Sequence, residues 1–268
     1  MPDLDKVFSG SIPELYETLL VPMIFEPYAA DLKARLDSMN VSQILEVAAG
    51  TGVVTRALAT LPGAEIVATD LNQAMLDKAA TMGTARPVRW QQADALALPF
   101  GDDEFDAVAC QFGAMFFPDK SKAFFEARRV LKPGGVFIFS VWDRIEENEF
   151  ADVITVALAS FFPEDPPRFL ARTPHGYHDR TLIAHDLAAG GFAKSPRIET
   201  VAARSRAESA RAAAVAYCQG TPLRNEIEAR GGSRLSEASD VAAVAIAREF
   251  GARAVEGKIQ AHVIEIRK

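Results

Sequence analysis

The sequence is poor in cysteine and in positive charge, and it contains no long apolar run. Its two cysteines, Cys110 and Cys218, are too few for a disulfide scaffold or a zinc site built from cysteines. A net charge of −7 argues against a surface that binds nucleic acid or anionic lipid. No apolar run reaches the roughly 18 residues of a membrane span, and the first residues lack the features of a secretory signal. We therefore expect a cytoplasmic protein that acts on neither nucleic acid nor membranes.

Apolar and charged residues are present in ordinary amounts, at 49% and 24% of 268 residues, which suffices for a packed core. Residues 41–142 alternate short apolar runs with longer segments of helical periodicity, separated by Gly, Pro, Asp or Asn. Such alternation predicts a parallel sheet with crossover helices. The predicted strands are 44–47, 65–69, 88–92, 105–110 and 136–142, and the predicted helices are 53–61, 72–82 and 119–131.

The segments that flank this core also show helical and strand-like patterns. Before it, we predict two or three short helices over residues 10–38, with breaks at Pro22 and Pro27. After it, the predicted helices are 149–161, 180–189, 209–219 and 240–250, and the predicted strands are 197–201 and 259–266. No linker or repeat separates a second domain. We expect one domain, with a helical lid (1–40), a cofactor-binding core (41–143), and a substrate insert followed by the remaining elements (144–268).

A glycine turn, Gly50-Thr51-Gly52, follows the first predicted strand. Such a turn lets backbone N–H groups approach a ligand at the mouth of a parallel sheet. Asp70 ends the second strand, 18 residues after Gly52, where a carboxylate can accept both hydroxyls of a ribose. Asp94 follows the third strand. Either aspartate could instead be a helix-terminal or turn residue, but their joint arrangement favours a nucleotide site.

The motifs that are missing from the turn indicate which class of nucleotide it could bind. Thr55 stands where a dinucleotide fingerprint has its third glycine, and no phosphate-binding P-loop sequence occurs. The ligand therefore resembles a nucleoside without a pyrophosphate. Glu46, a carboxylate in an apolar strand, must either pair within the core or face the ligand. An NAD(P)-dependent short-chain oxidoreductase is the alternative interpretation, although no Tyr-x-x-x-Lys pair follows the fourth strand.

Five motifs in chain order resemble a known family. They are Glu46-Val47-Ala48-Ala49-Gly50-Thr51-Gly52, Asp70, Ala93-Asp94-Ala95 with Leu98-Pro99-Phe100, Phe105-Asp106 and Leu131-Lys132-Pro133-Gly134-Gly135. Together they resemble the class I S-adenosylmethionine-dependent methyltransferases, in particular the small-molecule branch that includes the ubiquinone and menaquinone C-methyltransferases. The resemblance spans about residues 44–142. It implies an α/β, Rossmann-like sheet of seven mostly parallel strands, with residues 259–266 as an antiparallel last strand.

The resemblance also implies S-adenosylmethionine as the cofactor. The backbone of Gly50-Thr51-Gly52 would pass beside its methionine and ribose parts, and Glu46 would support the turn or the amino group. Ala48 stands where the family commonly has its first glycine, so its methyl group bears on how closely the turn approaches the cofactor. Gln111, just past the fourth strand, would face the amino-acid end of the cofactor.

The same resemblance assigns the ribose and adenine contacts to the second and third strands. Asp70 would hold the ribose hydroxyls, and Leu71 and Met75 would pack on the adenine. Asp94 with Ala95 would recognise the exocyclic amine of the adenine.

Methyl transfer from a sulfonium is an in-line displacement, so an enzyme contributes mainly alignment and exclusion of water. The sulfonium is a cation, which suits a pocket lined by aromatic faces. The aromatic residues that we expect at the substrate are Tyr16, Tyr28, Phe112, Phe116 and Trp142. Each could instead be ordinary packing between helices and core.

No catalytic residue can be assigned from the sequence. His178 and Tyr177 are the candidates for orienting or deprotonating the acceptor, because imidazole titrates near neutral pH. With His175 and His185 they match no strong metal motif, so we expect no metal. The predicted protein is a methyltransferase for a small aromatic or apolar metabolite. A non-catalytic module that binds S-adenosylmethionine is the other alternative, and the oligomeric state is left open.

Overall fold

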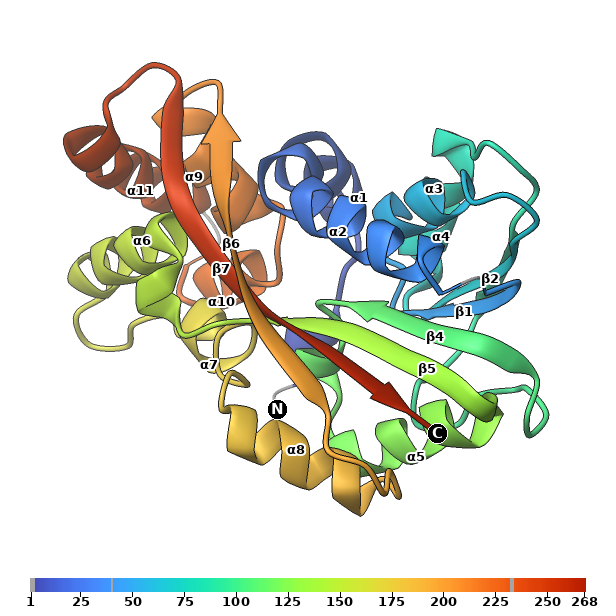
Figure 1. The fold of residues 1–268 in the computed structure, drawn as a ribbon. Coiled ribbons are helices and arrows are strands. Elements are labelled where there is room, and N and C mark those ends of the chain that lie inside the picture. Colours follow the sequence, from blue (N-terminus) through green and yellow to red (C-terminus); the bar gives the residue numbers. More distant parts are fainter. Residues whose placement is uncertain (1–2, 40, 232–233) are drawn as a thin grey trace. The chain divides into compact units, whose positions relative to one another are not determined.

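The computed structural model describes residues 3–39, 41–231 and 234–268 (Figure 1). They group into two compact units. Unit 1 comprises residues 1–25, 142–176 and 202–260, and unit 2 comprises residues 26–141, 177–201 and 261–268. The N-terminal 40 residues, which we expected to form one lid, are therefore divided between the units.

Unit 2 is built on a seven-stranded sheet with the strand order β3-β2-β1-β4-β5-β7-β6. The strands are β1 Gln43–Val47, β2 Glu65–Asp70, β3 Arg89–Gln92, β4 Phe105–Gln111, β5 Leu131–Trp142, β6 Arg197–Ala207 and β7 Val255–Arg267. Strands β1 to β5 pair in parallel. Strand β7 runs antiparallel to β5, because Lys268 N donates to Gly135 O whereas Asp143 N donates to Gln260 O. The predicted fold, a mostly parallel sheet with an antiparallel last strand, is confirmed.

The strand order places a topological switch point between β1 and β4. From β1 the chain adds β2 and β3 on one side, and it then crosses back to add β4 and β5 on the other. In open α/β sheets, ligands bind outside the carboxyl ends of the strands at such a point. The turns that follow β1, β2 and β4 are therefore where a ligand site is expected.

Helices cover both faces of this sheet. They are α2 Glu26–Asp37, α3 Val53–Leu58, α4 Gln73–Met82, α5 Lys120–Val130 and α8 Arg180–Ala189, with a short 3₁₀ turn, η3 Ala114–Phe116. Figure 1 shows α2, α3 and α4 over one face and α5 and α8 over the other. Ala29, Leu32 and Leu36, spaced by three and four residues, turn one side of α2 toward the core cluster that includes Ile44 and Ile138. Helix α2 is thus part of the unit 2 core.

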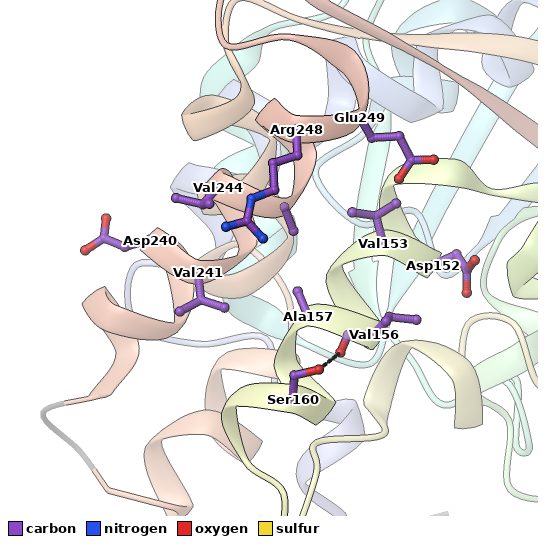
Figure 2. Close-up of a pocket in the computed structure, with 11 residues that line it drawn as sticks. Asp152, Val153, Val156, Ala157, Ser160, Asp240, Val241, Val244, Arg248 and Glu249 are labelled. Carbon is purple, nitrogen blue, oxygen red and sulfur yellow. Dashed lines mark hydrogen bonds between the residues drawn. The ribbon is translucent and has the colours of Figure 1, made fainter.

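Unit 1 contains mainly helices, together with the outer ends of β6 and β7. Its elements are η1 Asp3–Lys6, α1 Ile12–Leu15, the π-helical η2 Tyr16–Phe25, η4 Ile145–Glu147, α6 Glu149–Phe161, α7 Phe169–Arg172, α9 Ala210–Gln219, α10 Leu223–Ala229 and α11 Leu235–Phe250. A groove of about 900 Å³ lies between α6 and α11, lined by Val153, Val156, Val241 and Val244 with carboxylates at its rim (Figure 2). The groove carries none of the predicted site residues. None of the helices in the described part of the chain combines the length and apolar character needed to cross a membrane.

Several local predictions differ from the structure: β6 runs to Ala207 rather than residue 201, and α11 begins at Leu235 rather than residue 240. Pro22 does not break the chain's helical course but lies inside η2, because the wider π turn moves the carbonyl that a proline ring would meet in an α-helix. Strand β5 begins at Leu131 rather than Val136, and the register shift between Phe105 and Ala107 of β4 accommodates the four residues in between as a bulge. Pro27 lies in the first turn of α2, where proline is tolerated.

Candidate active site

The turn between β1 and α3 has a left-handed backbone at three positions. Gly50 and Gly52 have φ of +57° and +85°, and Ala48 has φ of +56°. A side chain on Gly52 would also collide with Trp90, whose Cη2 lies 2.9 Å from the position of an added Cβ. An alanine is uncommon in the left-handed region, and such strained residues concentrate at functional sites. The geometry requires the two glycines of the motif and tolerates Ala48 at some strain.

The loop after β4 packs directly on this turn. A Cβ added to Gly113 would lie 2.4 Å from Ala48 Cβ and 2.8 Å from Cys110 Sγ, so only glycine fits there. The preceding residue, Phe112, also has a left-handed backbone, with φ of +54°. The methyl group of Ala48 is therefore accommodated by a glycine on the neighbouring loop, and the ends of β1 and β4 meet at the switch point.

Asp70, the last residue of β2, braces the turn from the other side. Its Oδ2 accepts a hydrogen bond from Gly50 N at 2.9 Å, and its Oδ1 accepts one from Asn72 N at 2.8 Å. Burial raises the pKa of this carboxyl, and the backbone hydrogen bonds oppose the shift. A carboxylate has about four acceptor positions. The Asn72 side chain and the Leu71 backbone also interact with this carboxylate, so a contact between Asp70 and ribose hydroxyls stays a prediction.

Glu46 is buried in β1, with 2% of its surface exposed. Thr55 Oγ1 of α3 donates to its Oε2 at 2.5 Å, and Thr69 Oγ1 donates to its backbone oxygen at 2.8 Å. Burial raises the pKa of Glu46 to about 8, although the hydrogen bond from Thr55 lowers it. Near neutral pH the side chain is therefore mainly a neutral carboxyl, and its described side-chain partner is a hydroxyl.

The proposed adenine side presents an exposed apolar group. Leu71 directly follows Asp70 and is 45% exposed, whereas Met75 of α4 is buried. Asp94 Oδ1 accepts from Leu96 N at 2.9 Å, as in an ordinary turn, and Ala95 beside it is buried. An exposed leucine next to a carboxylate fits an adenosine, because the base needs an apolar surface and the ribose needs acceptors.

Two buried hydroxyls at this end of the sheet have no hydrogen-bond partner among the described residues. Thr51 Oγ1 lies in the glycine turn, and Ser140 Oγ lies near the end of β5. The two residues are 1% and 2% exposed. Buried polar atoms are almost always paired, so an orphaned hydroxyl in a ligand-binding turn points to a polar group supplied by the ligand. The residues present at the turn therefore fit the amino-acid end of S-adenosylmethionine.

Four of the residues predicted to contact the substrate lie in unit 2 and are described here: Tyr28, Phe112, Phe116 and His178. Tyr28 is buried in α2, donates its hydroxyl to Val201 O at 3.1 Å and meets the Phe112 ring at 5.2 Å. Phe116 of η3 and His178 are half-buried. The structure brings Tyr28 and Phe112 together beside the turn, and their contact with a substrate stays a prediction.

Tyr177 is buried between α5 and α8. Its hydroxyl donates to Asp186 Oδ2 at 2.8 Å, and Lys120 Nζ lies 4.6 Å from the centre of its ring. Burial and the Asp186 carboxylate raise its pKa well above the usual range. This setting keeps the phenol protonated near neutral pH, and a role of Tyr177 or His178 at the acceptor stays a prediction.

The predicted residues Tyr16 and Trp142 belong to unit 1. There the Phe25 ring stacks on Tyr16 at 5.0 Å and lies 6.0 Å from Trp142, which in turn lies 6.0 Å from His175. His175 Nδ1 is 2.8 Å from Asp143 O. Within the described ranges, no three His, Cys, Asp or Glu side chains gather as metal ligands would.

Comparison with known proteins identifies the core. Residues 45–139 match the family described as "Methyltransferase domain". This segment is therefore similar to methyltransferase domains, and the match supports S-adenosylmethionine as the cofactor. The chain is 39% identical over 116 residues to a ubiquinone/menaquinone biosynthesis C-methyltransferase UbiE of Marinomonas sp., covering 41% of this chain and 46% of that protein. It is 43% identical over 167 residues to the UbiE of Idiomarina loihiensis, covering 57% and 66%.

Solved structures show the same fold. A putative methyltransferase from Bacillus halodurans superposes with a TM-score of 0.57 at 20% identity, covering 89% of this chain and 98% of that one. The YcgJ protein of Bacillus subtilis gives 0.57 at 19% identity, covering 90% and 98%. The chain thus matches the fold over most of its length.

Among the curated relatives, the Thermus thermophilus demethylmenaquinone methyltransferase is 43% identical to this chain. The match covers 53% of that protein and 40% of this chain, so it spans only part of each.

Three residues of the site were not predicted from the sequence. Thr55 holds Glu46, Gly113 makes room for Ala48, and Ser140 leaves a buried hydroxyl at the end of β5. The signal for Ser140 was available, because it interrupts an apolar strand in the same way as Glu46 does. Thr55 and Gly113 became recognisable only when their neighbours across the fold were known.

Proposed function

We propose that the protein is a methyltransferase that moves a methyl group from S-adenosylmethionine to a small, largely apolar or aromatic metabolite. The observation that carries this proposal is the glycine turn at the switch point. It is held by Asp70 and contains the Thr51 hydroxyl, which is buried and has no hydrogen-bond partner in the part of the chain that the structure describes. In a domain of this family, such a turn is suited to the adenosine and amino-acid ends of the cofactor.

When bound, the cofactor would supply an electrophilic methyl group for in-line displacement from its sulfur, and the acceptor's proton would pass to solvent. The chain's own residues bind and align. Asp70 would accept from the ribose hydroxyls, the exposed face of Leu71 would pack on the adenine, and Asp94 with Ala95 would meet the adenine edge. The backbone of the turn and the Thr51 hydroxyl would hold the amino-acid end. Alignment and exclusion of water are the main sources of rate in such a displacement.

The acceptor class rests on charge and on the relatives. The net charge of −7 does not favour a polyanionic substrate. The curated relatives are named for C-methylation in ubiquinone and menaquinone biosynthesis, which supports an aromatic or quinone-like acceptor. We also propose a cytoplasmic location, because the two buried cysteines are free thiols, as is usual in a reducing compartment.

Calorimetry with two ligands tests the cofactor. We expect S-adenosylhomocysteine to bind with an affinity in the micromolar range and NADH to give no heat of binding. Binding of NADH without a response to S-adenosylhomocysteine would indicate a short-chain oxidoreductase instead.

Transfer of a labelled methyl group tests the reaction. The assay offers labelled S-adenosylmethionine with a set of hydroxylated naphthalenes and quinols, and we expect label in at least one of them. A protein that binds S-adenosylhomocysteine but labels none of these compounds would be a binding module rather than an enzyme for this acceptor class.

A further inference from the structure

Ser140 is an unexplained polar residue in the apolar strand β5. Its hydroxyl is fully buried and has no hydrogen-bond partner among the described residues. Leaving a buried donor or acceptor unsatisfied is unfavourable by about 1–3 kcal/mol. Valine or alanine would avoid this penalty, so the hydroxyl needs an explanation, and the place of Ser140 in the fold points to a partner that arrives with a ligand.

The strand register places Ser140 beside the cofactor turn. Ser140 pairs with Gln111 at the end of β4, and Ala109 of β4 pairs with Glu46 of β1. Since side chains alternate along strands, Glu46, Gln111 and Ser140 point to the same face of the sheet.

A chain of contacts links the same residue to the turn. Ser140 O accepts from Phe112 N at 3.0 Å. The next residue, Gly113, packs against Ala48 in the glycine turn. The Ser140 backbone therefore holds the loop that closes on the cofactor turn.

The chemistry of this face favours an uncharged oxygen. The three side chains offer a hydroxyl, a carboxamide and a carboxyl that burial keeps mainly protonated near neutral pH. Such groups pair well with a neutral hydroxyl or carbonyl. None of the three supplies the full charge that would compensate a buried ammonium or carboxylate on the acceptor.

We propose that the Ser140 hydroxyl binds the methyl acceptor, by a hydrogen bond to an uncharged hydroxyl or carbonyl oxygen next to the atom that receives the methyl group. The inference rests on the proposed function and narrows it, since it names the polar feature that the acceptor must carry. Ser140 is then a specificity-determining residue, and Gln111 is its neighbour on the same wall of the site.

The test compares two probes on protein saturated with S-adenosylhomocysteine. One probe, 1,4-dihydroxynaphthalene under reducing conditions, carries neutral oxygens, and the other, naphthalene, carries none. Wild-type protein is expected to bind the dihydroxy probe more tightly than naphthalene. Ser140→Ala is expected to weaken binding of the dihydroxy probe about 2- to 12-fold, the range for one net hydrogen bond. Its affinities for naphthalene and for S-adenosylhomocysteine should be unchanged.

A matched control is available in the other unit. Ser205 of β6 is likewise buried, and its hydroxyl has no partner among the described residues. Ser205→Ala should leave the binding of both probes unchanged. If Ser140→Ala does not fold, Ser140→Cys keeps the shape of the side chain at a slightly larger volume and replaces the hydroxyl with a poor hydrogen-bonding group, and it should show the same selective loss.

The possible results separate this inference from the proposed function. Equal affinity of wild type and Ser140→Ala for the dihydroxy probe would overturn the inference, and so would an equal loss for naphthalene. A wild type that binds S-adenosylhomocysteine but does not prefer the dihydroxy probe would refute the acceptor feature while leaving the cofactor site intact. A failure to bind S-adenosylhomocysteine would instead refute the proposed function itself.

Discussion

Replacing Glu46 with glutamine should remove a large part of the pH dependence of stability. Burial raises the pKa of Glu46 from the ordinary value of 4.5 to about 8. Between these two values the folded protein holds a proton that the unfolded chain has released, so stability falls as the pH rises. At about 1.4 kcal/mol per pH unit, Glu46 accounts for a loss of about 3 kcal/mol between pH 5.5 and pH 8.5.

The glutamine variant keeps the shape of the protonated side chain and the acceptor for Thr55 Oγ1, but it does not titrate. We expect Glu46→Gln to be about as stable as the wild type near pH 5.5 and more stable by about 3 kcal/mol near pH 8.5. Urea unfolding at several pH values measures this difference. Trp90, which packs under Gly52, reports on unit 2 when Trp142 is replaced by phenylalanine in both proteins.

Glu126→Gln is the matched control. A hydrogen bond from Arg129 is the main cause that lowers the pKa of Glu126, so its contribution to stability is present above its ordinary pKa and is lost only in acid. The slope between pH 5.5 and pH 8.5 should therefore be the same in Glu126→Gln as in the wild type. If Glu46→Gln lost stability with rising pH as steeply as the wild type, Glu46 would be ionised in the fold and our account of its environment would be wrong.

Two further substitutions test the turn. Asp70→Asn should reduce the affinity for S-adenosylhomocysteine at least about tenfold, because the carboxylate holds Gly50 N and offers acceptors to the ribose; unchanged affinity in calorimetry would limit Asp70 to bracing the turn. Gly113→Ala should destabilise unit 2 by about 1–3 kcal/mol in urea unfolding, because the new methyl group meets Ala48 Cβ. Adding Ala48→Gly should recover part of this loss, and no recovery would show that the strain lies elsewhere.

The strands of the core were predicted well, because the residues within each strand carry the apolar pattern that identifies it. The strands of the core are short apolar runs, and the predicted boundaries of β1 to β4 lie within a residue or so of the observed ones. Helix caps are equally local contacts. Asp119 Oδ1 accepts from Lys122 N at 2.9 Å, and Asp179 Oδ1 accepts from Thr181 N at 2.8 Å, as a side chain just before a helix does. Such contacts span two or three residues.

Contacts that join distant segments could not be predicted in the same way. The sequence marked Tyr28 and Tyr177 as aromatic residues with a hydroxyl, but nothing local indicated that these hydroxyls donate to Val201 O and Asp186. The division of residues 1–40 between two units has the same origin. Apolar spacing predicts that α2 and η2 are helical, whereas the core that each one joins depends on the fold of the remaining chain.

The two residues of this turn that depart from the glycine-rich pattern, Ala48 and Thr55, each contact a neighbouring position that accommodates or uses them. Ala48 replaces a glycine, and its methyl group occupies space that Gly113 leaves open on the loop after β4. Thr55 stands where a dinucleotide fingerprint has its third glycine, and its hydroxyl satisfies the buried carboxyl of Glu46. A glycine at position 55 would leave that carboxyl without this donor, in a site where an unpaired polar group is unfavourable by a few kcal/mol. The same threonine that distinguishes the motif from a dinucleotide site therefore keeps Glu46 in place beneath the cofactor turn.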